Sequence, residues 1–210
     1  MSYWRDSNFR ALLTVVEELS AELDYAAYVR YLRDRERGLR KQSFRHLDRF
    51  IEHVLSLPFE RRCGIVDRLK LIDRERVATD LIPFPLRDRL IEPTLSEWKV
   101  RESNNATPRR WSYDLHDLRQ AVRLDANEHI ARRTLVADLL RDVSHATHEI
   151  AAGFGYIGDP AQDLPKLDEA ERLLEEMQDP EQRAALSRWI AELRPIVQEW
   201  LDHPGRPRAL

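Results

Sequence analysis

The stretch WSYDLHDLRQAVRLDANEHIARRTLVADLLRDVSHATHEI, residues 111–150, decides the fold class of this chain. On either side of a polar break at residues 124–127, apolar residues recur every three or four positions. They are Leu115, Leu118, Ala121 and Val122 before the break, and Ile130, Ala131, Thr134, Leu135, Ala137, Leu139 and Val143 after it. This spacing places each set on one face of a helix. Asn127 is expected to cap the second helix, because its short side chain accepts hydrogen bonds from the unpaired N–H groups of a first turn. The stretch therefore predicts two amphipathic helices.

The residues before this stretch show the same helical spacing, interrupted by glycine and proline. Gly38 is expected to end a helix, because glycine tolerates a positive φ. Pro93 suits the first turn of a helix over residues 94–100, preceded by a separate short helix around residues 86–91. No segment alternates in the manner of a strand. The sequence therefore predicts an all-α fold of stacked helical hairpins, either an α-solenoid or an irregular helical bundle.

Two long loops divide the predicted helices. Residues 102–110, ESNNATPRR, are polar and carry no apolar period, so they separate an N-terminal helical region (1–101) from a C-terminal one (111–201). Residues 151–165 hold three of the 6 glycines, so a second loop is expected there, with helices resuming at Lys166. Asp179 followed by Pro180 predicts another helix start. We expect the two regions to pack as one continuous unit.

The composition limits the class of protein. Hydrophobic residues make up 42% of the 210 residues and charged residues 34%, which is apolar enough for a core. The net charge of -3 disfavours a chain that binds polyanions as a whole. A single cysteine, Cys63, cannot form an internal disulfide, and no apolar run reaches the ~20 residues of a membrane span. We expect a cytoplasmic protein without a membrane partner.

The C-terminal region resembles the tetratricopeptide-repeat family. The resemblance rests on Leu118, Ala121 and the run RLDAN (residues 123–127), which is similar to the turn that ends such a repeat, with Ala126 where proline is usual. Trp111 and Leu115 stand where large apolar residues of an earlier helix occur. The resemblance covers roughly residues 111–178. It implies paired helices that stack on one another and a protein that binds proteins or peptides.

Metal-capable side chains are densest at Asp142, His145, His148 and Glu149. Their spacing places them along one side of a helix, and a metal there needs further ligands, such as His116 or His129. Tighter helical metal motifs are not present. The favoured interpretation is a polar helix end with hydrogen-bonded histidines, without metal.

The glycine-rich loop and Cys63 are two further places where a chemical role is conceivable and a structural role is favoured. The glycines Gly153, Gly155 and Gly158 follow a helix and lack a following Lys-Ser/Thr, so a phosphate-binding loop is disfavoured and no cofactor is expected. Cys63 lies near His46 and His53 in sequence, yet a buried, unreactive thiol is favoured over a nucleophile.

The segment from Arg30 to Arg45 is the strongest local concentration of charge. It carries seven basic residues against the two acids Asp34 and Glu36. Three interpretations are open: a solvated helix face, a nucleic-acid site, and a docking surface for an acidic protein. Nucleic acid is disfavoured, because a wider basic footprint is usual. The docking interpretation assigns Arg33, Arg37 and Lys41 to the contact.

Such a contact needs apolar surface to hold the two proteins together. The candidates for that surface are Tyr31, Trp98 and Trp189, if they are exposed. Residues 159–199 are acidic, so a second copy of the chain is another conceivable partner. The sequence thus favours a non-catalytic interaction protein. The alternatives are a metal-dependent helical enzyme at His145 and His148, and a nucleic-acid-binding regulator that uses residues 30–45.

Overall fold

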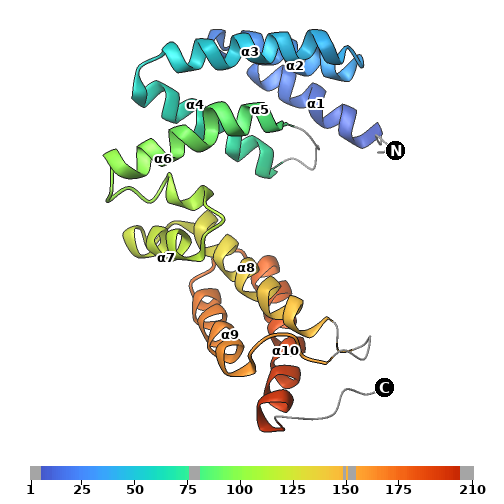
Figure 1. Ribbon diagram of the computed structural model, residues 1–210, viewed down its shortest axis with the longest axis vertical. Coiled ribbons are helices and arrows are strands. Elements are labelled where there is room, and N and C mark those ends of the chain that lie inside the picture. Colours follow the sequence, from blue (N-terminus) through green and yellow to red (C-terminus); the bar gives the residue numbers. More distant parts are fainter. Residues whose placement is uncertain (1–5, 76–80, 149, 151–154, 204–210) are drawn as a thin grey trace. The chain divides into compact units, whose positions relative to one another are not determined.

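A computed structural model describes residues 6–75, 81–148, 150 and 155–203 of the chain. In these ranges the chain forms helices and loops and no strand (Figure 1). The predicted all-α fold is therefore confirmed. The chain divides into two compact units, Met1–Ser103 and Asn104–Leu210. The division falls inside the loop predicted at residues 102–110, and the packing of the two regions as one continuous unit stays a prediction.

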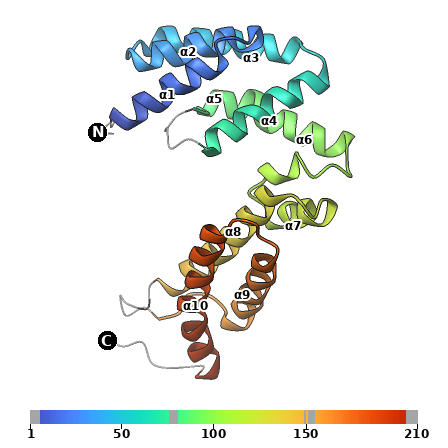
Figure 2. The same ribbon diagram turned by 180° about the vertical axis from the view of Figure 1, so that it is seen from behind.

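The first unit is built from helices joined by short turns. In chain order they are α1 (Asp6–Leu19), η1 (Leu23–Tyr25), α2 (Ala26–Glu36), α3 (Arg40–Ser56), α4 (Phe59–Glu75), α5 (Phe84–Leu86), the π-helical turn η2 (Arg87–Ile91) and α6 (Glu92–Arg101). Helix α2 packs against both α1 and α3, and α4 packs against α3 and α6 (Figure 2). Tyr28, Leu32, Leu47, Phe50 and Val66 are among the side chains buried in the core of this unit.

The segment before α6 differs from the prediction of two separate helices. From Phe84 to Arg101 the chain is helical without a break, and Pro93 lies inside this run. The reason is the π turn: the Glu92 N–H donates to the Arg87 carbonyl, five residues back. Proline has no N–H to donate and crowds the preceding turn, and a wider turn relieves that conflict. Any helix within residues 76–80 lies outside the described residues.

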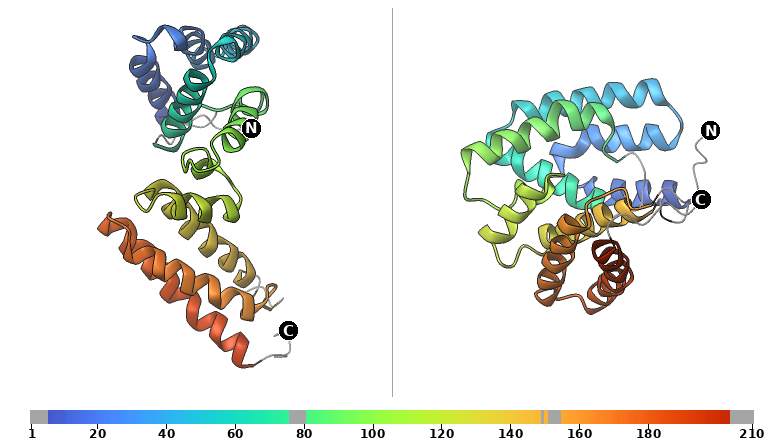
Figure 3. Two further views of the ribbon diagram at one scale, coloured as in Figure 1. Left: turned by 90° about the vertical axis from the view of Figure 1, so that its left-hand side faces the viewer. Right: turned by 60° about the horizontal axis from the view of Figure 1, so that its bottom comes forward.

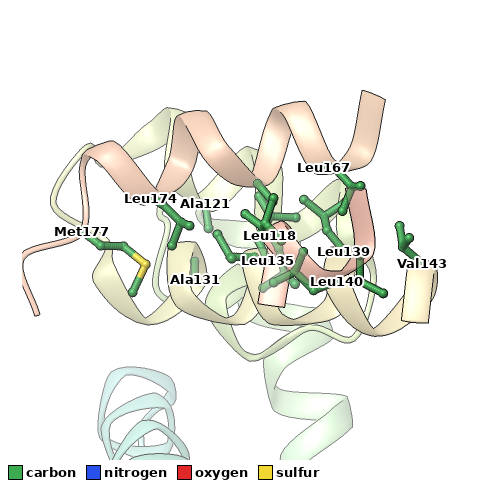
Figure 4. Packing of buried hydrophobic residues seen from close by; sticks show 14 of the residues in the cluster. Leu118, Ala121, Ala131, Leu135, Leu139, Leu140, Val143, Leu167, Leu174 and Met177 are labelled. Atoms are coloured by element: carbon green, nitrogen blue, oxygen red, sulfur yellow. The ribbon is translucent and has the colours of Figure 1, made fainter. Parts of the chain in front are cut away.

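The second unit consists of η3 (Arg109–Trp111), α7 (Leu115–Leu124), α8 (His129–Thr147), α9 (Pro160–Glu175) and α10 (Pro180–Asp202). Helix α8 packs against α7, α9 and α10, and α9 and α10 lie side by side (Figure 3). Its core is the apolar cluster shown in Figure 4, where Leu118 and Ala121 of α7 meet Leu135 and Leu139 of α8. Most of the apolar stripe predicted in residues 111–150 is therefore buried in the core. Ile130, Thr134 and Ala137 are only partly buried, and the core also contains Val136 and Leu140, which the prediction left out.

The helix starts of this unit correct two predictions. The cap of α8 is Glu128 and not Asn127, because Asp125 accepts the Asn127 N–H in a turn that delays the helix, and Glu128 Oε1 then accepts from the Ile130 N–H at 3.2 Å. Helix α9 begins at Pro160 and not at Lys166, because Asp159 caps it by accepting from the Ala161 N–H. Asp179 caps α10 as predicted.

The end of the glycine-rich loop is fixed against α8 and α9. The Ile157 N–H donates to the Ala146 carbonyl at 3.0 Å, and the Tyr156 hydroxyl donates to Asp163 Oδ2 at 2.5 Å. A Cβ on Gly158 would lie 2.6 Å from the Ala146 Cβ. Glycine is therefore required at this close approach. Phe154, in the same loop, lies outside the described residues.

Candidate interaction surface

The hairpin of α2 and α3 carries the basic segment, and a glycine turn reverses the chain between the two helices. Gly38 has φ +74°, as its predicted role of helix stop requires. Its N–H donates to the Arg35 carbonyl at 3.0 Å, and the Leu39 N–H donates to the Asp34 carbonyl at 2.8 Å. This pair of bonds is the Schellman motif, which satisfies carbonyls at a helix end. The turn therefore places the start of α3 directly beside the end of α2.

An aromatic core sets which faces of the two helices meet solvent. The rings of Tyr28 and Phe50 lie 5.1 Å apart, and those of Tyr28 and Tyr31 lie 5.6 Å apart. The Tyr28 hydroxyl donates to the Leu81 carbonyl, which supplies the partner that a buried phenol needs. Since Leu47 and Phe50 of α3 are fully buried, the opposite faces of both helices point outward.

The outward faces carry two stripes of cations. Arg30, Arg33 and Arg37 are exposed on α2 at i, i+3 and i+7. On α3, Lys41, Arg45 and Arg49 are exposed at i, i+4 and i+8. Together with the exposed Arg40 at the start of α3, these seven residues are called the basic hairpin surface below. Residues at these spacings are neighbours along one side of a helix.

Within the part of the chain that the structure describes, none of the seven forms an ion pair with a carboxylate. Arg33 Nη2 lies 3.5 Å from the Ser20 hydroxyl, and Arg40 lies over the Phe44 ring. The two acids of the segment do not pair with the seven cations: Asp34 is buried, with its Oδ2 3.5 Å from His46 Nε2, and Glu36 forms no ion pair within the described residues. Asp48 of α3 pairs with Arg89 instead. The positive charge of the surface is therefore not balanced by carboxylates of the described chain.

Other arginines of the same unit form ion pairs with carboxylates. The five that lie on α4, η2 and α6 and pair with carboxylates are Arg61, Arg62, Arg68, Arg89 and Arg101. Arg61 Nη2, for example, lies 2.6 Å from Asp24 Oδ2. The hydrogen bond from Arg61 and a second one from His53 lower the pKa of Asp24. In the described part of this unit, cations that form no ion pair are concentrated on the hairpin, and Arg87 of η2 is a further one.

The predicted aromatic contacts need correction. Tyr31 is fully buried and Trp98 is only 8% exposed, so neither offers the exposed surface that the docking interpretation required of them. Both side chains belong to the core of the first unit, where neighbouring helices cover them. Trp189 is partly buried and packs against the apolar cluster of the second unit. The exposed large apolar side chains of the described hairpin are instead Leu39, at 44% exposure, and Leu55, at 43% exposure near the far end of α3.

The two histidines proposed as metal ligands do lie close together. The ring centroids of His145 and His148 are 4.8 Å apart, and His148 Nδ1 donates to the His145 carbonyl at 2.5 Å. Asp142, of the same cluster, accepts from Lys166 Nζ at 2.5 Å. Glu149 lies outside the described residues, and in the residues that are described no three such side chains gather as a metal site.

Cys63 does not form a nucleophile pair with either His46 or His53. The thiol is buried in α4, and burial raises the pKa of Cys63 to about 12. His53 Nε2 lies 3.2 Å from Asp24 Oδ1, and His46 faces Asp34. A protonated, enclosed thiol is a poor nucleophile, because the thiolate is the reactive form.

Sequence reasoning found Arg33, Arg37 and Lys41 but missed Arg49 and Leu39. The spacing of residues 41, 45 and 49 marks Arg49 as a member of the α3 stripe. Leu39 carried no comparable signal, since an apolar residue between helices is normally expected to be buried.

Comparisons with family models, with curated proteins and with solved structures find no match to this chain. No helix in the described ranges has the length and apolar content to cross a membrane.

Proposed function

We propose that this chain is a non-catalytic interaction protein of helical-repeat type, which binds an acidic protein partner through the basic hairpin surface. One observation carries the proposal. Seven exposed cations gather on α2 and α3 without a carboxylate partner in the described chain, whereas five arginines elsewhere in the same unit are ion-paired. A partner that brings carboxylates to this surface gains ion pairs that the fold itself does not use.

The chemistry of the surface suits recognition. Six of its seven side chains are arginines, which keep their charge at every physiological pH and hold carboxylates through two parallel hydrogen bonds. Such groups do not exchange protons near neutral pH, so they bind anions without serving as acid or base. The packing of α2 against α1 and α3 gives these side chains a rigid support.

The energetics predict how the contact forms. Each exposed ion pair contributes only ~0–1 kcal/mol, because water and salt screen it. Seven like charges on one hairpin nevertheless attract an acidic partner over roughly 8–10 Å at physiological salt. The charges therefore speed association more than they slow dissociation. The association rate constant is expected to fall steeply with salt.

The test compares two triple charge reversals. The first, Arg33→Glu, Arg37→Glu and Lys41→Glu, reverses the hairpin. The second, Arg172→Glu, Arg183→Glu and Arg188→Glu, reverses three exposed arginines of α9 and α10 that likewise form no ion pair within the described residues. Full-length protein is immobilised, and proteins from its native host are captured and identified for wild type and both variants.

The proposal requires a partner that binds wild type and the α9–α10 variant, and that associates more slowly with the hairpin variant at low salt. Circular dichroism must show equal helix content for all three proteins. If every captured partner associates with the hairpin variant at the wild-type rate, the surface is only a solvated helix face. If the hairpin variant loses helix, single reversals of Arg33 and Arg37 replace it and face the same criterion.

A further inference from the structure

The tip of the basic hairpin surface is not uniformly polar. Leu39 is 44% exposed and lies between the exposed residues Arg37, Arg40 and Lys41. Gly38, beside it, has no side chain, and a Cβ there would have no neighbouring atom within 4 Å. An accessible aliphatic side chain is thus flanked in sequence by three exposed cations. It lies in the turn that joins α2 to α3 (Figure 1).

Local stability does not account for leucine at this position. Leu39 is the N-cap residue of α3 and makes no side-chain capping bond, although Ser, Thr, Asp or Asn there would stabilise the helix start. An apolar residue in this part of a Schellman motif usually packs on the residue five positions earlier. Here that residue is Asp34, a buried carboxylate. The leucine is therefore available to a partner.

Arg40 is held beside this leucine. Its guanidinium carbon lies 6.0 Å from the centroid of the Phe44 ring, and Arg35 lies at the same distance from that ring. A cation over an aromatic face is attracted by the ring. The contact with Phe44 therefore restrains the Arg40 side chain along the first turn of α3.

Resting on the proposed function, we infer that the tip recognises an acidic helical peptide segment that places one aliphatic side chain on Leu39 and carboxylates on the cations around it. The α3 cations repeat every four residues, which is about 6 Å along the helix axis. Carboxylates at i, i+4 and i+8 of a partner helix have the same repeat. A nucleic acid supplies charge through its phosphates but offers no aliphatic side chain to Leu39.

The test uses full-length protein and three fluorescent probes, read by anisotropy at two salt concentrations. The first probe is a 16-residue helical peptide with glutamates at one-turn spacing and a leucine at one end. The second replaces that leucine by serine, and the third is a random DNA duplex. The variants are Leu39→Ser, Arg37→Glu and, as a control, Leu124→Ser, which changes a leucine of the second unit with 37% exposure. Serine at position 39 provides a helix cap, so loss of folding is not expected.

The inference predicts that Leu39→Ser weakens binding of the leucine peptide roughly three- to tenfold, as expected for losing a partly buried leucine contact, with the salt dependence unchanged. Arg37→Glu weakens binding of both peptides and reduces the salt dependence, while Leu124→Ser changes neither. With the serine peptide, wild type and Leu39→Ser bind alike.

Three results overturn the inference. If Leu39→Ser binds the leucine peptide as tightly as wild type does, Leu39 takes no part. If the duplex binds more tightly than either peptide and Leu39→Ser makes no difference, the surface is a polyanion site, and the proposed protein partner falls with it. If neither peptide binds while hairpin-dependent capture of a partner persists, the partner is not an acidic helix, and the proposed function stands alone.

Discussion

Arg119 and Glu169 form a bidentate ion pair that joins α7 to α9. Arg119 Nε donates to Glu169 Oε1 and Arg119 Nη2 donates to Glu169 Oε2, each at 2.7 Å. The hydrogen bonding of Arg119 to Glu169 also raises the pKa of Arg119. The two residues are 50 positions apart in the chain, so the pair exists only once the second unit has folded.

A double-mutant cycle measures how much this ion pair stabilises the fold. Arg119→Ala, Glu169→Ala and the double variant are expected to give a coupling energy of about 0.2–1 kcal/mol in urea unfolding, because the side chains are 39% and 22% exposed and salt screens them. Arg119→Lys keeps the charge but is expected to recover only part of this energy, since lysine lacks the planar fork. A coupling energy of zero would contradict the expected stabilisation of the second unit by this pair.

Two glycine substitutions are expected to act in opposite directions. Gly158→Ala is expected to lower the free energy of unfolding by about 1–3 kcal/mol, because the new Cβ would collide with the Ala146 Cβ and with Asp163 Oδ2. Gly64→Ala is the matched control in α4, where a Cβ meets no atom within 4 Å, and it is expected to raise that energy by up to about 1 kcal/mol. Urea midpoints measure both. Equal effects of the two substitutions would contradict the close packing at Gly158.

The Cys63 thiol is expected to be unreactive in the folded protein. Burial raises its pKa from 9.0 to about 12, so almost no thiolate is present at pH 8. A disulfide reagent such as DTNB should label the thiol only after urea unfolds the chain. Because the unfolded thiol ionises near pH 9 while the folded one stays protonated, stability should fall as pH rises above 9. Cys63→Ala should reduce that slope, and rapid labelling of native protein would refute the burial.

Asp24 is expected to make the free energy of unfolding fall at low pH, whereas Cys63 makes it fall at high pH. Its pKa is lowered below 3.8, first by the hydrogen bond from Arg61 and then by that from His53. A carboxyl group with a depressed pKa stabilises the fold above the unfolded value, and this contribution disappears as pH falls from 3.8 through the folded pKa. The stability difference between wild type and Asp24→Asn should therefore be constant near neutral pH and shrink below pH 3.8. A difference that grows on acidification would contradict the pairing.

Replacing both His145 and His148 by Gln is expected to leave the metal content of purified protein unchanged and near zero. Two imidazoles meet in the structure, but the nearby Asp142 is engaged by Lys166. Elemental analysis after dialysis measures the result. Stoichiometric zinc in wild type that the variant lacks would place the metal-enzyme alternative ahead of the interaction protein.

Much of the fold could be predicted because burial in a helix follows a local period. Leu118, Leu135 and Leu139 were assigned to one face from spacing alone, and all three are buried. The end of α2 at Gly38 followed equally from local chemistry. The start of α9 carried a similar signal in Asp159 and Pro160, which the glycines before it concealed.

The candidate site was less predictable, because it depends on contacts between distant residues. Sequence spacing shows charges near one another on a helix, but it does not show that Asp48 pairs with Arg89, 41 positions away, while Arg45 and Arg49 remain without a carboxylate. The burial of Trp98 depends in the same way on the helices around it. Which side chains a fold leaves available is a property of its tertiary packing.

The π turn before α6 acts as a rotational spacer. It holds one more residue than an α-helical turn would, and each residue of an α-helix corresponds to a rotation of roughly 100°. With the extra residue, Leu86 lies on the same side as Ile91 and Leu95, and all three are buried. Pro93→Ala alone, if it converts the π turn to a regular α-helix without loss of a residue, would rotate Leu86 away from Ile91 and Leu95. Deleting one residue from 87–89 at the same time would keep Leu86 on their side. The sequence of this helix is therefore out of phase with an α-helix by one residue, and the π turn brings its two parts back into register.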